Sequence, residues 1–293
     1  MISFYRLSSL LLVMTMFFSS CSKEGCTDPV AENYDADAKN DDGNCEYILG
    51  CMDESSIAYN SLATKDDGSC VYLDNTKRSL VFKATATWCT YCGEWGAEYV
   101  NNIYADFSGD AEVIALHRDD DFSVDIGYNF LSTLNPSGVP SFYLGLNPMG
   151  NAGYGNVSNL ITSELSNPSQ VSMAVSYTVE NGEMNIKVLS QLENQFAGDN
   201  CYLAMYVMED GQVAPQEVNG TGTVSNFVHN HILRSEANGS TFGVPISFTN
   251  GINNTEITTP LVPNSIWTHE NLYVIAVIWK QNGNSYDFIN LRR

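Results

Sequence analysis

The residues best suited to chemistry are two cysteines, Cys89 and Cys92, in the run Trp88-Cys-Thr-Tyr-Cys92. A pair at this spacing can alternate between dithiol and disulfide, and can exchange disulfides with another protein through a mixed disulfide. The same pair can also form a permanent structural disulfide. The spacing alone leaves both roles open.

The surrounding elements must hold this pair at the end of a strand. Residues from Ser79 onward form an apolar run that leads into the motif, and residues 96–103 are compatible with a helix. Residues 111–117 indicate the next buried parallel strand, and Gly138-Val-Pro140 precedes another apolar run. A strand that ends in Trp-Cys-x-x-Cys at a helix start resembles the thioredoxin fold. The order of these features extends the resemblance over residues 76–167.

The thioredoxin resemblance implies a role for each residue of the motif. Cys89 is expected to be the nucleophile, because backbone N–H groups and the dipole at a helix N-terminus stabilise a thiolate. Cys92 then resolves the mixed disulfide, and Trp88 shields one side of the sulfur. Pro140 is expected to be cis and to present its neighbour's backbone to an extended substrate. Lys83 departs from the pattern, because thioredoxins usually carry a buried acid at this position.

The chain has eight cysteines, and this number indicates an oxidising compartment. Four of them lie in an internal repeat, in which residues 25–47 match residues 50–72 in register. Neither unit has enough apolar residues for a core, and a disulfide that closes such a loop contributes about 3 kcal/mol. We therefore expect two disulfides, Cys26–Cys45 and Cys51–Cys70. Cys201 remains as a buried free thiol.

The repeats allow two interpretations. Closely spaced carboxylates in the first unit offer the oxygen ligands that calcium prefers; they are Asp35, Asp37, Asp41 and Asp42. Alternatively, the repeats form an acidic spacer. Residues 22–75 contain 13 acidic side chains against 3 lysines, and the repulsion among the excess carboxylates keeps the segment extended. We favour the spacer, and the cysteine chemistry requires no cofactor.

Residues 1–20 have the features of an export signal: Arg6, an apolar stretch from Leu10 to Phe18, and small residues before Cys21. This order resembles a bacterial lipoprotein signal, which implies that Cys21 is acylated and anchors the protein to a membrane. The polar residues 22–24 resemble the tether of lipoproteins displayed on Gram-negative cells. We therefore expect a surface-exposed outer-membrane lipoprotein. The alternative is an ordinary secretory signal with an incidental cysteine.

The carboxyl-terminal segment, residues 168–293, changes to a strand period. Alternating residues at 171–179 and 184–190 flank an Asn-Gly turn and predict a hairpin. Short strands joined by turns, with no helical period, predict an antiparallel β-sandwich. The further strands are expected at residues 201–208, 242–248, 272–279 and 286–291.

The same segment carries a family resemblance. Residues 207–216 and the run Phe227-Val-His-Asn-His-Ile-Leu-Arg234 resemble the outer-membrane-protein-28-related lipoproteins of Gram-negative envelopes. That family joins a thioredoxin-like region to a β-rich domain, and the match extends over roughly residues 79–291. His229 and His231, two positions apart, would lie on one face of a strand; we favour a structural role for them over a metal site.

The expected fold is α/β plus all-β. It comprises a signal peptide at 1–20, an acidic spacer at 21–75, a thioredoxin-like domain at 76–167 and a β-sandwich at 168–293.

Two functions remain open for this architecture. One is thiol–disulfide exchange on exported proteins through Cys89 and Cys92. The other is a non-catalytic surface module that binds a protein or a glycan, with the cysteine pair as a structural disulfide. A net charge of −21, from 34 acidic and 13 basic residues, excludes nucleic acid as a partner. Membrane contact is expected through the lipid anchor.

Overall fold

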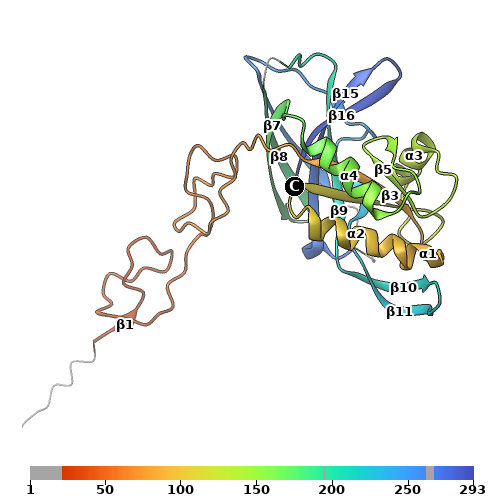
Figure 1. Ribbon diagram of the computed structural model, residues 1–293. Coiled ribbons are helices and arrows are strands. Elements are labelled where there is room, and N and C mark those ends of the chain that lie inside the picture. Colours follow the sequence, from red (N-terminus) through yellow and green to blue (C-terminus); the bar gives the residue numbers. More distant parts are fainter. Residues whose placement is uncertain (1–21, 194–195, 262–266) are drawn as a thin grey trace, which may run out of the picture.

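The computed structural model describes residues 22–193, 196–261 and 267–293. Its amino-terminal part extends away from the rest of the protein as two small loops (Figure 1). One disulfide closes each loop, joining Cys26 to Cys45 and Cys51 to Cys70 at a sequence separation of 19. The export signal and the lipidated Cys21 that we expect lie outside the described residues.

The two loops have equivalent internal hydrogen bonds. Tyr47 Oη donates to Asp28 at 2.8 Å in the first loop, and Tyr72 Oη donates to Asp53 at 2.7 Å in the second. Polar contacts and a disulfide thus hold each loop, which lacks the apolar side chains for a core. The first loop also contains two short paired strands, β1 (Glu24–Gly25) and β2 (Asn40–Asp41).

A nine-stranded mixed sheet forms the centre of the protein. Its strand order is β16-β15-β9-β12-β4-β3-β5-β6, with β13 paired to β9. Every residue of β3 and of β4 is buried, because the sheet is covered on both faces there. The strands are β3 (Ser79–Thr85), β4 (Ala111–His117), β5 (Ser141–Leu144), β6 (Asn147–Pro148), β9 (Cys201–Glu209), β12 (Ile232–Glu236), β13 (Val244–Pro245), β15 (Leu272–Asn282) and β16 (Ser285–Arg292).

Helices cover both faces of this sheet near β3 and β4. The helices α2 (Trp95–Asp106) and α4 (Tyr154–Leu165) pack on the face that carries Val81 and Val113. The helix α3 (Asp125–Leu134) packs on the opposite face, against Phe82. Alternation along the strands explains this division, since adjacent residues point to opposite faces.

A second, three-stranded sheet packs against the part of the large sheet formed by β9 and β15. It has the order β14-β8-β7. Met173 and Ile186 of this sheet share a core with Met205 and Val274 of the large one. The carboxyl-terminal segment is thus built from two packed layers of strands. The bounds are β7 (Val171–Glu180), β8 (Glu183–Leu192) and β14 (Ile252–Pro260).

The large sheet runs through both of the segments that the sequence analysis separated at residue 167. Ile232 of β12 pairs with Ala115 of β4, whose N–H donates to the carbonyl of His231 at 2.7 Å. The carboxyl-terminal strands therefore continue the sheet begun by β3 and β4. The division into a thioredoxin-like domain at 76–167 and a β-sandwich domain at 168–293 stays a prediction.

A long hairpin projects from the large sheet beneath the first helices (Figure 1). It consists of β10 (Gln212–Val218) and β11 (Gly222–His229). Their sequences did not predict these strands, because the apolar residues do not alternate regularly along them. The described region also contains a 3₁₀ turn, η1 (His269–Asn271).

Two local expectations were wrong. Residues 242–248 form only the two-residue strand β13, because Pro245 has no N–H to donate and Gly243 packs against the backbone of Leu203 with a φ of 79°. His229 and His231 do not share a strand, since β11 ends at His229 and His231 has a φ of 61° in the following turn.

Among the described residues, no helix has the length and apolar character needed to cross a bilayer.

Candidate functional site

The Cys pair lies just after the end of β3, where the chain enters a short helix, α1 (Thr90–Gly93). Cys89 and Cys92 form a disulfide with their Cα atoms 5.2 Å apart. Cys89 caps α1, because its Sγ accepts a hydrogen bond from the N–H of Cys92 at 3.1 Å. The helix stops at Glu94 and restarts as α2, so the single helix that we expected is two pieces.

The loop that contains Pro140 lies beside the sulfur atoms. The Val139–Pro140 peptide bond is cis, and Cys89 Sγ lies 3.4 Å from the carbonyl oxygen of Val139. A Cβ on Gly96 would lie 3.0 Å from the Pro140 ring, so glycine allows α2 to approach this loop closely. The structure therefore brings together Cys89, Cys92 and Pro140, and their catalytic role stays a prediction.

Trp88 lies at the edge of this site. Its ring is 51% exposed, and its Nε1 donates to the carbonyl of Arg118 at 3.1 Å. The indole is thus held in place while one face remains open to solvent. An exposed aromatic ring of this kind is available to contact an approaching protein.

The hairpin of β10 and β11 fastens the loop that carries the cysteines. Gln216 Nε2 donates to the carbonyls of Ala86 at 3.3 Å and Cys89 at 3.0 Å, and the N–H of Glu217 donates to Thr87 at 2.8 Å. The approach is so close that a Cβ on Gly93 would lie 2.5 Å from the carbonyl oxygen of Glu217. Nothing local in the sequence indicates this contact, because it joins segments about 130 residues apart.

Asp120 ties the end of β4 to the same loop. Its Oδ2 lies 2.7 Å from His117 Nδ1 and accepts the N–H of Thr87 at 2.8 Å. Burial lowers the pKa of His117 below 6.5, although Asp120 acts in the opposite direction. His117 is therefore neutral at physiological pH, and its hydrogen bond to Asp120 has a structural role.

Lys83 is buried on the wall of a cavity that Cys92 also lines. The residue is 9% exposed. Among the described residues, no carboxylate pairs with it. Burial lowers the pKa of Lys83 from 10.5 to about 8, because the ammonium has lost its hydration.

The His-Asn-His run is placed around the same cavity. His229 and His231 both line it, and burial lowers the pKa of each to about 4. The ring of His231 stacks on Tyr104 with centroids 4.4 Å apart, and Asn230 Oδ1 accepts the N–H of Gly211 at 2.7 Å. Both histidines are therefore neutral side chains in a packed setting.

Arg234, at the end of that run, forms a buried ion pair. Its Nε donates to Glu209 at 2.5 Å, and the two side chains are 1% and 0% exposed. The guanidinium also lies over the rings of Phe122 and Trp267, at 5.1 and 5.8 Å. This pair stabilises the join between β9 and β12, which is a structural role.

The proposed calcium ligands accept local hydrogen bonds. Asp35 binds Lys23 at 2.6 Å, while Asp41 and Asp42 accept the N–H groups of residues 43 and 44. Asp37 is nearly fully exposed. In the described part of the chain, no three metal-ligating side chains come together. Calcium binding stays a prediction.

Cys201 is a free cysteine on β9 and is fully buried. Burial raises the pKa of its thiol, so the reactive thiolate form is disfavoured.

The fold is similar to that of a solved structure described as HBP35 of Porphyromonas gingivalis. The match has a TM-score of 0.64 and 15% identity, and covers 75% of each chain. A domain of the outer membrane lipoprotein Omp28 from Porphyromonas gingivalis also aligns, with a TM-score of 0.31 and 13% identity over 42% of this chain and 85% of that one. No curated protein matches the chain.

The family model described as outer membrane protein Omp28 matches residues 129–293. The matched segment includes the His-Asn-His run, the Arg234–Glu209 pair and the whole carboxyl-terminal part of the sheet. Because this match covers more than half of the sequence, the chain belongs to the Omp28 outer membrane protein family.

Proposed function

We propose that the protein is a lipid-anchored, surface-exposed member of this outer-membrane family that exchanges disulfides with exported proteins through Cys89 and Cys92. Family membership supports the location. The succession β3, α1, α2, β4 and β5, with a cis-proline before β5, supports a thioredoxin-like region. The anchor is proposed at Cys21.

The surroundings of Cys89 Sγ carry this proposal. The sulfur accepts the N–H of Cys92 at 3.1 Å and lies 3.4 Å from the carbonyl of Val139. The N–H group stabilises a thiolate on Cys89 after reduction, and the cis-proline loop offers its backbone to an incoming peptide. The exposed Trp88 ring adds an apolar contact for the same peptide.

The exchange proceeds in two balanced steps. The Cys89 thiolate attacks one sulfur of a substrate disulfide, which forms a mixed disulfide and releases one substrate thiolate. The Cys92 thiolate then attacks Cys89 Sγ, which re-forms the Cys89–Cys92 disulfide and releases the second substrate thiolate. Two electrons pass from the protein to the substrate, and the reverse sequence oxidises a substrate dithiol.

Lys83 is the group best placed to accept the thiol proton of Cys92, because both residues line the same cavity. A lysine pKa of about 8 leaves a usable fraction of the neutral amine near pH 7, so Lys83 can accept the thiol proton before the resolving step. In its charged form it favours the thiolate. Either form compensates for the absence of a buried acid.

One observation favours the second function, a surface-binding module with a structural disulfide. The hairpin packs over α1, and Cys89 and Cys92 are only 6% and 2% exposed. A disulfide that is covered in this way is hard for a large substrate to reach.

Thiol trapping of the full-length protein tests the proposal. Cys92→Ser should accumulate mixed disulfides with envelope proteins, because the resolving thiol is absent. The matched control is Cys89→Ser, which should trap nothing, and both variants carry Cys201→Ala. After mild reduction of the wild type, Cys89 should be alkylated well before Cys92.

A redox titration, combined with the trapping result, can contradict the exchange function. If the pair stays oxidised at strongly reducing potentials and Cys92→Ser traps no partner, the exchange function is wrong. The surface-binding module would then remain.

A further inference from the structure

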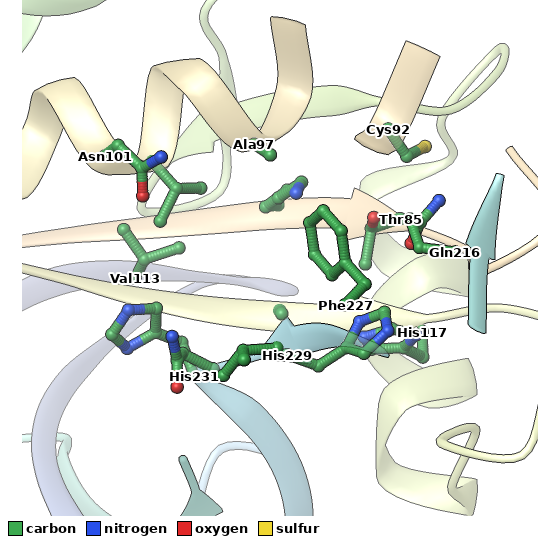
Figure 2. A pocket seen from close by; sticks show the side chains of 15 residues that line it. Thr85, Cys92, Ala97, Asn101, Val113, His117, Gln216, Phe227, His229 and His231 are labelled. Carbon is green, nitrogen blue, oxygen red and sulfur yellow. The ribbon is translucent and has the colours of Figure 1, made fainter. Parts of the chain in front are cut away.

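A cavity of about 300 Å³ lies between α2 and the end of β11 (Figure 2). In that view Ala97 and Asn101 of α2 lie on one side, Phe227 and His229 of β11 lie on the other, and Cys92 is at one end. The exposed side chains of Asn101, Val228 and Asn230 mark its mouth. This volume is large enough to hold a small organic molecule.

The inner end of the cavity is rich in nitrogen groups. Lys83, His117 and His229 come from three different strands, and their residues are only 9%, 4% and 6% exposed. None of the described residues that line the cavity is acidic. This lack of carboxylates contrasts with a chain that carries a net charge of −21.

Two nitrogen atoms of these groups lack a partner within the described chain. Lys83 has neither an ion pair nor a hydrogen bond there, and burial is the only effect on its pKa. His229 Nε2 is buried without a hydrogen bond. Buried polar atoms are normally satisfied, so an unpartnered ammonium and an unpartnered imidazole nitrogen on one cavity indicate a ligand.

The Lys83 ammonium acts on the three histidines across the cavity by disfavouring their protonated forms. Lys83 lowers the pKa of His117, His229 and His231. Asp120 and Asp210 lie beside His117 and His231 and hold one nitrogen of each ring, at 2.7 and 3.4 Å. An anion between Lys83 and His229 would give the buried ammonium the counter-charge that it lacks among the described residues.

We propose that the cavity binds a small organic monoanion, whose carboxylate is received by Lys83 and His229 and whose apolar body lies against Phe227 and Val113. The carboxylate satisfies both unpartnered groups through charge-assisted hydrogen bonds. The apolar body contacts the ring and the methyl groups, which inorganic phosphate cannot do. The site shares Lys83 with the proposed exchange function, but its test does not depend on exchange, because binding is measured with the Cys pair oxidised.

Calorimetric titration of the oxidised full-length protein with benzoate tests the proposal. Benzamide has the same shape without the charge, and inorganic phosphate has the charge without the apolar body. We expect benzoate to bind and benzamide to bind at least about tenfold more weakly, since a hydrogen bond to a charged group contributes about 1.5–3 kcal/mol. Phosphate should also bind at least about tenfold more weakly, because it buries no apolar surface against Phe227 and Val113.

Lys83→Met and His229→Leu should each weaken benzoate binding by about tenfold or more. The control is Lys187→Met, which removes a lysine that is 44% exposed and outside the cavity, and which should leave binding unchanged. If Lys83→Met does not fold, His229→Leu reports on the same site. Absent benzoate binding, equal binding of benzamide or of phosphate, or full affinity in the cavity variants would each overturn the proposal.

Discussion

Replacing Lys83 with methionine should stabilise the protein, although it alters a residue of the proposed site. Methionine keeps the length of the side chain and removes the ammonium. The pKa of Lys83 falls from 10.5 to about 8 because burial disfavours the charged form. Since one pKa unit corresponds to about 1.4 kcal/mol, the charged side chain lowers the free energy of unfolding by about 3 kcal/mol at pH 7.

The effect of Lys83 depends on pH in a defined direction. Below about pH 8 the amine is protonated in the folded and in the unfolded chain, so the destabilisation is complete. Between pH 8 and 10.5 the unfolded chain binds the proton more tightly, and the wild type gains stability as the pH rises. The advantage of Lys83→Met should therefore fall to about half by roughly pH 9.5.

Urea unfolding at pH 7 and pH 9.5, in a buffer without organic anions, measures the stabilisation by Lys83→Met and its dependence on pH. The other titratable groups near Lys83 do not interfere: His229 and His231 have pKa values of about 4, and burial also lowers the pKa of His117. The exposed control Lys187→Met should change the free energy of unfolding by less than about 0.5 kcal/mol at either pH. A Lys83→Met variant that is destabilised, or whose advantage does not depend on pH, would refute the reasoning.

Three further predictions concern the anchor, the hairpin and the sheet. Cys21→Ser should release the protein from membranes, and a variant still bound in high salt on fractionation would contradict lipid anchoring. Gly93→Ala should destabilise by about 1–3 kcal/mol in urea unfolding, because its Cβ would lie 2.5 Å from a carbonyl of the hairpin; the helical control Gly127→Ala has room and should stabilise by about 0.5–1 kcal/mol. Arg234→Met should cost about 3–5 kcal/mol, since it leaves Glu209 buried and unpaired; a thermal midpoint equal to that of the wild type would disprove this role.

Local sequence patterns were sufficient to predict the structural features that depend on residues close together in the chain. The repeat unit predicts the disulfide between Cys26 and Cys45. Alternation of apolar and polar residues on either side of an Asn-Gly turn predicts β7 and β8. Long apolar runs identify β3, β4, β9 and β15. In each case the signal lies within about twenty residues, where the period of side-chain direction determines which face is buried.

Contacts between distant segments could not be read in this way. β12 enters the large sheet between β9 and β4, and this register depends on which apolar faces the whole chain can bury together. Gln216 reaches the carbonyl of Cys89 only because the hairpin folds back over α1. No period or motif encodes such a contact.

The candidate site shows the same division. The sequence located Cys89, Cys92 and Pro140, because their types and spacing are themselves the signal. It identified Lys83 as a departure but not its surroundings, since burial of the amine depends on α2, β4 and β11 closing around it. The desolvation that lowers the pKa of Lys83 exists only once these elements have packed, which is why tertiary structure determines the electrostatics of the cavity.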